Sequence, residues 1–285
     1  MTGTGAPDDR WEGDAIAAWQ RRWNVPALRV LAMAASTNDE ARVLAQAGAP
    51  AGTVVIADHQ SAGRGREGRR WHDTPGESLL LSVVLRPARS ADPASPGPAP
   101  LRVGLAACDA IRRVTGIETR LKWPNDVLTS DDRKLAGILC EAVSGADPFV
   151  VAGVGINVLQ SDAAWPPELA GRVTSIRAVA GAAPTRAALA AALIDALRPF
   201  TPGTAELDAA ELDAFRRRDA LDGREIALDG EPAGTAAGIG ADGALIIRTP
   251  AGTRTVHSGT VRPVRQSYIE TRDREHSTSA TRPRP

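Results

Sequence analysis

Apolar residues along the chain alternate between short strand-like runs and stretches with helical spacing. Strands are predicted at 27–33, 53–57, 78–85, 119–123, 126–128, 135–143 and 149–158. Helices are predicted at 14–23, 101–114, 185–200 and 206–218. Because strand follows strand between 119 and 158 with only tight turns between them, antiparallel or mixed pairing is expected, and a doubly wound parallel sheet is not.

A further helix is expected to begin at Thr37. Thr37 with Glu40 three residues later has the spacing of a capping box, and the helix would turn Ala41, Leu44 and Ala47 inward before Gly48. The loop 36–38 therefore lies at a helix N-terminus.

The two ends and one internal connection have a different composition from the rest. Residues 1–13 are polar and expected to fray, 87–100 is a Pro/Ala/Ser stretch typical of a surface loop, and the chain from about 266 looks disordered. From Gly223, short strand patterns at 224–228, 233–239, 243–249 and 252–257, separated by DG and PAG turns, predict a small β-barrel appended near Leu221.

Composition and length narrow the class of protein. The 285 residues are 43% hydrophobic and 24% charged, which suits one large domain with a small one. Apolar runs such as 79–81 and 83–85 are far shorter than the roughly 20 residues of a membrane span, and the start lacks a signal peptide, so a cytoplasmic protein without membrane association is expected. Cys108 and Cys140 lack CxxC spacing, which argues against a disulfide framework or zinc site.

The charge pattern directs attention to two lysines. The 34 basic and 34 acidic residues cancel, so bulk attraction to nucleic acid is not expected. Only Lys122 and Lys134 among the basic residues are lysines. In a chain that otherwise uses arginine, these two lysines suggest chemistry that a planar guanidinium cannot perform. Chance placement is the alternative.

The stretch Gly63 to Trp71, GRGREGRRW, combines three glycines with four arginines. Glycines let backbone amides approach a ligand, and arginines can fork onto phosphate oxygens, so this pattern predicts a phosphate clamp. Its spacing fits neither the P-loop nor the dinucleotide fingerprint. A solvated or nucleic-acid-binding RG loop is the alternative, and the position between two apolar strands favours the clamp.

Three other motifs carry candidate chemistry. KWPND at 122–126 places a cation, an amide and a carboxylate on one turn, RKLAGIL at 133–139 puts a lysine at a strand start, and GVGIN at 153–157 puts small residues in a buried strand. An ordinary Asn-Asp turn, a solvated lysine and close backbone packing are the corresponding structural alternatives.

Together with Ser36-Thr37-Asn38 and the stretch from Gln60 to Trp71, these motifs resemble the biotin protein ligase family in content and order. The resemblance covers about 28–262. It implies an α+β fold, with a catalytic domain like that of class II aminoacyl-tRNA synthetases around a central mixed sheet, and a C-terminal SH3-like barrel. The corresponding divisions are 1–27 (N-terminal extension), 28–220 (catalytic domain), 221–265 (SH3-like domain) and 266–285 (disordered tail).

The resemblance also implies an activity. Biotin and ATP would form biotinyl-5′-adenylate and pyrophosphate, and a lysine of a biotin carboxyl carrier domain would then attack the adenylate. Lys134, Arg66 and Asp126 are the implied catalytic residues, with Asp126 serving either Mg²⁺ or the acceptor lysine.

The remaining implied roles are divided between the two substrates. Biotin would be bound by Ser36, Thr37, Asn38, Gln60, Gly63, Arg64, Lys134, Gly137, Gly153 and Gly155. ATP and the adenylate would be bound by Arg64, Gly65, Arg66, Arg69, Trp71, Asn125, Lys134 and Asn157.

Other functions remain open at this point. A lipoate or octanoate ligase or transferase shares the carrier-lysine chemistry, and a biotin-binding regulator without turnover is a second alternative. Only about 27 residues precede the matching region, so DNA binding is not expected. A monomer or weak homodimer is expected.

Overall fold

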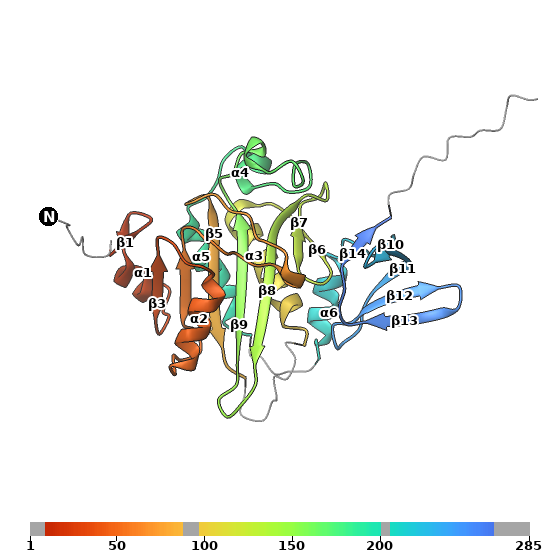
Figure 1. Ribbon diagram of the computed structural model, residues 1–285, viewed down its shortest axis with the longest axis horizontal. Coiled ribbons are helices and arrows are strands. Elements are labelled where there is room, and N and C mark those ends of the chain that lie inside the picture. Colours follow the sequence, from red (N-terminus) through yellow and green to blue (C-terminus); the bar gives the residue numbers. More distant parts are fainter. Residues whose placement is uncertain (1–8, 88–96, 201–205, 265–285) are drawn as a thin grey trace, which may run out of the picture.

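The computed structural model describes residues 9–87, 97–200 and 206–264, and a seven-stranded sheet forms its centre (Figure 1). The strands run in the order β3 (Leu28–Leu31), β4 (Val54–Ala57), β5 (Ser78–Leu85), β9 (Phe149–Asn157), β8 (Lys134–Val143), β7 (Asp126–Leu128) and β6 (Arg120–Lys122). Only β3 and β4 pair in parallel, and the other pairs are antiparallel. The predicted mixed sheet is confirmed.

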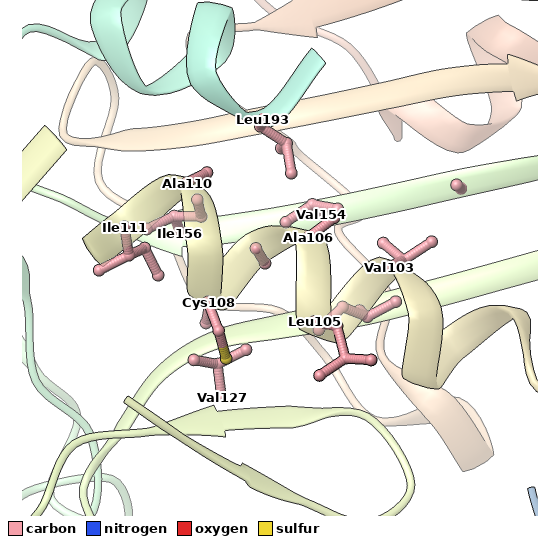
Figure 2. Packing of buried hydrophobic residues seen from close by; sticks show 14 of the residues in the cluster. Val103, Leu105, Ala106, Cys108, Ala110, Ile111, Val127, Val154, Ile156 and Leu193 are labelled. Carbon is pink, nitrogen blue, oxygen red and sulfur yellow. The ribbon is translucent and has the colours of Figure 1, made fainter. Parts of the chain in front are cut away.

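Helices cover both faces of this sheet. On one face, α2 (Thr37–Gln46) packs on β4, β5 and β9. On the other face, α3 (Ala99–Thr115) and α5 (Arg186–Leu197) pack against each other and against the strands. Figure 2 shows Val103, Ala106 and Ala110 of α3 among Val154 of β9 and Leu193 of α5. Burying these apolar side chains is the main favourable term in the stability of the domain.

The start of α2 differs from the predicted capping box. Ser36 occupies the N-cap position without a side-chain capping bond. The Thr37 hydroxyl instead donates to Gln60 Oε1 at 3.1 Å, so it is unavailable as the capping group. Ala45 is buried in place of Ala47, because the helix register places 41 and 45 one turn apart on the inner face.

The segment before the sheet is packed against it and does not fray from residue 10 onward. β1 (Arg10–Trp11), β2 (Asp14–Ala15) and α1 (Ile16–Arg22) form a small unit on the central domain. Trp11 is only 4% exposed, and its ring is covered by the Arg186 guanidinium at 5.4 Å. The predicted fraying is therefore wrong for 10–13, which one indole and its ion-paired neighbours anchor, while residues 1–8 lie outside the described residues.

The C-terminal strands form a separate antiparallel sheet. Its order is β13 (Gly252–Val256), β12 (Leu245–Thr249), β11 (Glu231–Ile239), β10 (Glu225–Leu228) and β14 (Val261–Pro263). The first four match the predicted barrel strands, and β14 was not predicted. Trp123, 1% exposed, donates its Nε1 hydrogen to Gly243 O at 3.0 Å, which joins the two sheets.

The remaining elements are short or connect the two sheets. They are the helices α4 (Ile176–Ala180) and α6 (Ala209–Arg216) and the 3₁₀ turns η1 (Arg66–Gly68) and η2 (Asp162–Ala164). A surface loop was predicted at 87–100. Residues 88–96 of it lie outside the described residues, and α3 already begins at Ala99. The predicted disordered tail at 266–285 also lies outside the described residues. No helix in the described ranges is long and apolar enough to cross a membrane.

Candidate active site

A cavity of about 1060 Å³ lies on the face of the sheet that carries α2. Its walls come from the loop at 63–71, from strands β6 to β8 and from the C-terminal sheet, which contributes Thr260 and Arg262. The cavity thus lies where the central sheet meets the C-terminal sheet.

Glycines on two neighbouring strands form its floor. Gly137 of β8 lies opposite Gly155 of β9. A Cβ atom would lie 2.9 Å from the Trp71 ring at Gly137 and 2.7 Å from it at Gly155. A Cβ atom on Gly153 would lie 2.2 Å from Asn38 Oδ1. The glycines were expected to leave space for a ligand, but here that space holds Trp71 and Asn38.

Both lysines of the chain bind one carboxylate. The β6–β7 hairpin pairs Lys122 with Asp126, and Lys134 begins the next strand. Asp126 Oδ2 lies 3.2 Å from Lys122 Nζ, and Oδ1 lies 2.5 Å from Lys134 Nζ. Burial opposes ionisation of Asp126, but the two ammonium groups outweigh it and lower the pKa to about 2. We call these three residues the lysine cluster; at neutral pH it has one positive charge more than it has negative.

The opposite end of the cavity contains neutral polar groups. Gln60 Oε1 accepts hydrogen bonds from Thr37 N at 2.7 Å and Thr37 Oγ1 at 3.1 Å. Ser82 Oγ lies 2.8 Å from Thr37 Oγ1 and 2.7 Å from Asn38 Oδ1. All four side chains belong to buried residues, and Thr37, Asn38 and Gln60 among them are predicted biotin-binding residues.

The glycine-arginine loop is a small hairpin with a base and a tip. Gly65 N donates to Arg69 O at 2.6 Å and Trp71 N donates to Gly63 O at 2.9 Å, which closes the hairpin. Its tip is η1, where Glu67 has a left-handed φ of 57° and accepts a hydrogen bond from Thr260. No ion pair joins Arg66 or Arg70 to another residue within 9–87, 97–200 and 206–264.

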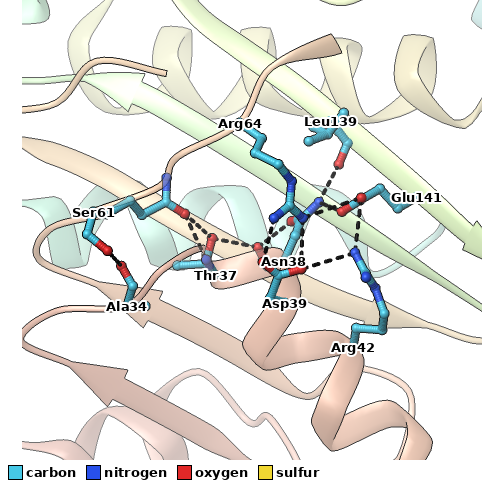
Figure 3. A network of polar contacts seen from close by, with 11 residues as sticks. Ala34, Thr37, Asn38, Asp39, Arg42, Ser61, Arg64, Leu139 and Glu141 are labelled. Atoms are coloured by element: carbon cyan, nitrogen blue, oxygen red, sulfur yellow. Dashed lines mark hydrogen bonds and ion pairs between the residues drawn. The ribbon is translucent and has the colours of Figure 1, made fainter. Parts of the chain in front are cut away.

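At the base of the loop, Arg64 belongs to a second ion cluster (Figure 3). Its Nη2 donates to Asp39 Oδ1 at 2.8 Å and lies 3.5 Å from Glu141 Oε1. Arg42 binds the same Glu141 oxygen at 3.0 Å. The hydrogen bonds from Arg64 lower the pKa of Asp39, and that carboxylate raises the pKa of Arg64. We call Asp39, Arg42, Arg64 and Glu141 the arginine cluster.

Most of the predicted site residues are brought together in the cavity. Its lining includes Ser36, Thr37, Asn38, Gln60, Arg64, Gly65, Arg66, Arg69, Trp71, Asn125, Asp126, Lys134, Gly137, Gly153 and Gly155.

Two predicted residues lie apart from the cavity lining. Asn157 is 2% exposed and donates Nδ2 to Thr174 O at 2.9 Å, while its Oδ1 is buried without a hydrogen-bond partner among the described residues. Gly63 is paired through its backbone with Trp71. Neither residue lines the cavity, and their predicted ligand contacts stay predictions.

Several lining or supporting residues were not predicted as site residues. Lys122 could have been found from the rarity of lysine, whereas no local pattern marks Asp39, Glu141 or Ser82, which meet only in the folded chain. Thr260 and Arg262 come from the C-terminal sheet, far away in sequence.

The predicted Mg²⁺ role of Asp126 does not fit this arrangement. Both carboxylate oxygens already face ammonium groups. Within the described part of the chain, no three His, Cys, Asp or Glu side chains gather as metal ligands. Asp126 is therefore assigned to the lysines.

Comparisons with known proteins agree with this geometry. The model for the biotin/lipoate A/B protein ligase family matches residues 30–157, and the model for the biotin protein ligase C terminal domain matches 225–262. A biotin–acetyl-CoA-carboxylase ligase of Paracoccus denitrificans is 36% identical over 246 residues, covering 81% of this chain and 98% of that protein.

Two further relatives support the assignment. The enzyme of the same description from Mycobacterium tuberculosis is 43% identical over 171 residues, which cover 59% of this chain and 61% of the relative. The biotin protein ligase of Aquifex aeolicus in complex with biotin and ATP superposes with a TM-score of 0.68 at 27% identity, covering 84% of this chain and all of the other. The chain belongs to the biotin protein ligase family.

Proposed function

We propose that this chain activates biotin with ATP in the cavity described above and transfers it to a lysine of a carrier domain. Biotin's carboxylate attacks the α-phosphorus, a new C–O–P linkage forms, and the bond to the departing pyrophosphate breaks. The neutral amine of the carrier lysine then attacks the carbonyl carbon, the C–N bond forms as the C–O bond to AMP breaks, and the nitrogen loses its proton to water. The observation that carries this proposal is the lysine cluster, which has a positive charge in excess within a cavity of suitable size.

Lys134 is the central cation in this proposal. The carboxylate and the phosphate repel each other until a cation lies between them, and a fixed ammonium lowers the energy of the charged transition state. Lys134 begins β8 beside the cavity floor, and its Nζ lies 5.6 Å from the centre of the Trp71 ring. The adenylate would thus lie against Trp71 and take a hydrogen bond from Lys134.

Asp126 acts through the lysines. With a pKa of about 2 it is a poor proton acceptor near neutral pH, so its contribution is to hold Lys134 in place. When the adenylate draws Lys134 toward the phosphate, the carboxylate becomes available to the incoming amine of the carrier. Asp126 would then orient that amine, which is the acceptor-lysine role predicted above.

The tip of the glycine-arginine loop supplies further positive charge. Arg69 pairs with Glu67 at 3.3 Å, and within the described part of the chain no ion pair holds Arg66. Guanidinium groups bind phosphate oxygens in a fork, so Arg66 and Arg69 would bind the phosphates of ATP. Arg64 would contribute through its backbone, because its side chain is held by the arginine cluster.

The neutral end of the cavity suits the ureido ring of biotin. Ser36, Thr37 and Gln60 offer hydroxyl and amide groups in buried positions, and such groups recognise an uncharged polar ring without a large desolvation penalty. Asn125, whose Nδ2 donates to Ile138 O at 2.7 Å, lines the cavity and is assigned to the adenine side.

The carrier is proposed to be the biotin carboxyl carrier domain of a biotin-dependent carboxylase, since two relatives are described as ligases for acetyl-CoA carboxylase. The absence of DNA binding, the monomer or weak homodimer, and the cytoplasmic location all stay predictions. Lipoate or octanoate is the alternative acid, because the matching family description includes lipoate.

The test separates these acids. The purified protein is incubated with MgATP and biotin, lipoate or octanoate in turn; pyrophosphate release is recorded before a carrier domain is added, and the carrier's mass afterwards. The proposal expects pyrophosphate release with biotin, followed by the mass of one biotinyl group on one carrier lysine. Release with lipoate or octanoate only would establish the alternative, and no release with any acid would point to a regulator without turnover.

A further inference from the structure

The arginine cluster links the two ends of the binding site that the proposed function uses. Asn38 Nδ2 donates to Glu141 Oε2 at 2.6 Å and to Leu139 O at 3.1 Å, while Asn38 Oδ1 faces Ser82. Glu141 Oε1 faces Arg42 and Arg64. A continuous set of polar contacts therefore runs from Thr37 at the ring-binding end to Arg64 at the base of the glycine-arginine loop (Figure 3).

The charges in this cluster balance, which distinguishes the base of the loop from its tip. Two guanidinium groups face two carboxylates, and their side chains are 27% to 37% exposed. Arg64 could bind an incoming anion only by giving up two carboxylates. At the tip, Arg69 pairs with Glu67 and no ion pair holds Arg66 among the described residues, which leaves positive charge for a ligand.

Resting on the proposed function, we propose that Asp39 and Glu141 are positioning residues that fix the base of the loop on α2 and β8 before substrate binds. Rearrangement on ligand binding is then confined to residues 66–69. Glu141 has a second effect, because it also orients Asn38 above Gly153 and so keeps the biotin end and the loop base in one arrangement.

The first test uses hydrogen exchange of the ligand-free protein, which does not depend on activity. The variants Asp39→Asn and Glu141→Gln keep the shape of each side chain and remove its charge. We expect amide exchange in 63–71 to accelerate about tenfold in both variants, because the loop base opens more often once a charged partner is lost. Matched controls are Asp213→Asn, from an exposed i,i+3 pair on α6, and Glu231→Gln, at the exposed first residue of β11. Exchange within twofold of the controls would overturn the proposal.

The second test measures biotin affinity by calorimetry without ATP. We expect the dissociation constant to rise about tenfold in Glu141→Gln and less in Asp39→Asn, since only Glu141 contacts Asn38. Adding Asp39→Asn to Arg64→Gln should increase loop exchange no further than Arg64→Gln alone, because both residues act through one contact. Additive effects in that double variant would indicate general destabilisation and contradict the proposal. If the unmodified protein fails to bind biotin, the proposed function fails, while the exchange data still decide whether the loop is anchored.

Discussion

The lysine cluster lines the cavity and the arginine cluster reaches it through Arg64, yet the charges of the two clusters are arranged for different tasks. In the lysine cluster, two ammonium groups share the single carboxylate of Asp126. In the arginine cluster, two guanidinium groups face two carboxylates. A cluster with excess positive charge can take an anionic ligand while keeping its own carboxylate paired, whereas a neutral cluster loses internal contacts when an anion arrives.

The two clusters also differ in the type of cation that each contains. A guanidinium presents several donors in a plane, so Arg64 can contact the carboxylates of Asp39 and Glu141 at the same time. An ammonium is compact and can shift between Asp126 and a nearby phosphate without rotating a plane. The chain keeps lysine only in the cluster where the proposed chemistry requires such a shift.

The largest expected effect comes from making the lysine cluster resemble the arginine cluster. We expect Lys134→Arg to lower the rate of biotinyl-adenylate formation by about 100-fold, because the larger fork does not fit between Asp126 and Trp71. Single-turnover quench experiments with biotin and MgATP would measure this rate. Lys122→Arg is the matched control and should lose only a few-fold. Equal losses in both variants would remove the distinction between the two lysines.

A larger side chain on the cavity floor tests how firmly the arginine cluster holds Asn38. In Gly153→Ala the new Cβ meets Asn38 Oδ1, which cannot shift without breaking contacts to Ser82 and Glu141. We expect the free energy of unfolding to fall by about 1 to 3 kcal/mol. Denaturant unfolding measures this change. Gly104→Ala is the control, because its Cβ meets only the flexible end of Leu121 at 3.0 Å and should be tolerated.

Because the pKa of Asp126 is lowered, the contribution of the lysine cluster to stability should depend on pH in the acid range. The carboxyl titrates near pH 4 in the unfolded chain and near pH 2 in the folded one, so its contribution is complete above about pH 4 and lost between about pH 4 and pH 2. We expect Asp126→Asn to lower the free energy of unfolding at pH 7 by about 2 kcal/mol. The difference from the unmodified protein should vanish near pH 2, and a difference that persists unchanged at pH 2 would argue against the pairing.

A smaller effect of opposite sign is expected at Asp219, where no cation cluster compensates burial. Burial raises the pKa of Asp219 to about 6, and its Oδ2 has no hydrogen-bond partner in the described part of the chain. The folded protein therefore loses stability as the pH rises from about 4 to about 6. Asp219→Asn retains an oxygen for Leu221 N and should be more stable at pH 7 by about 1 to 2 kcal/mol. Equal unfolding midpoints at pH 4 and pH 7 in the unmodified protein would contradict this.

The sequence predicted the central strands and the main helices because their apolar periodicity records which faces are buried. It also predicted much of the cavity, because the motifs that form it are local. The sequence-based predictions failed where the role of a residue depends on partners far away in the chain. Trp11 looked like part of a frayed end, and Thr37 looked like a capping residue. Glu141 lay in no motif, yet it joins Asn38 to Arg64.

The most direct test of the contrast between the clusters is a crystal structure of this protein with biotinyl-5′-adenylate. The account predicts that the phosphate lies within hydrogen-bond distance of Lys134 Nζ and of an arginine at the loop tip, with Arg64 still bound to Asp39 and Glu141. A phosphate held by the Arg64 side chain, with Asp39 released and Lys134 still bound only to Asp126, would contradict it.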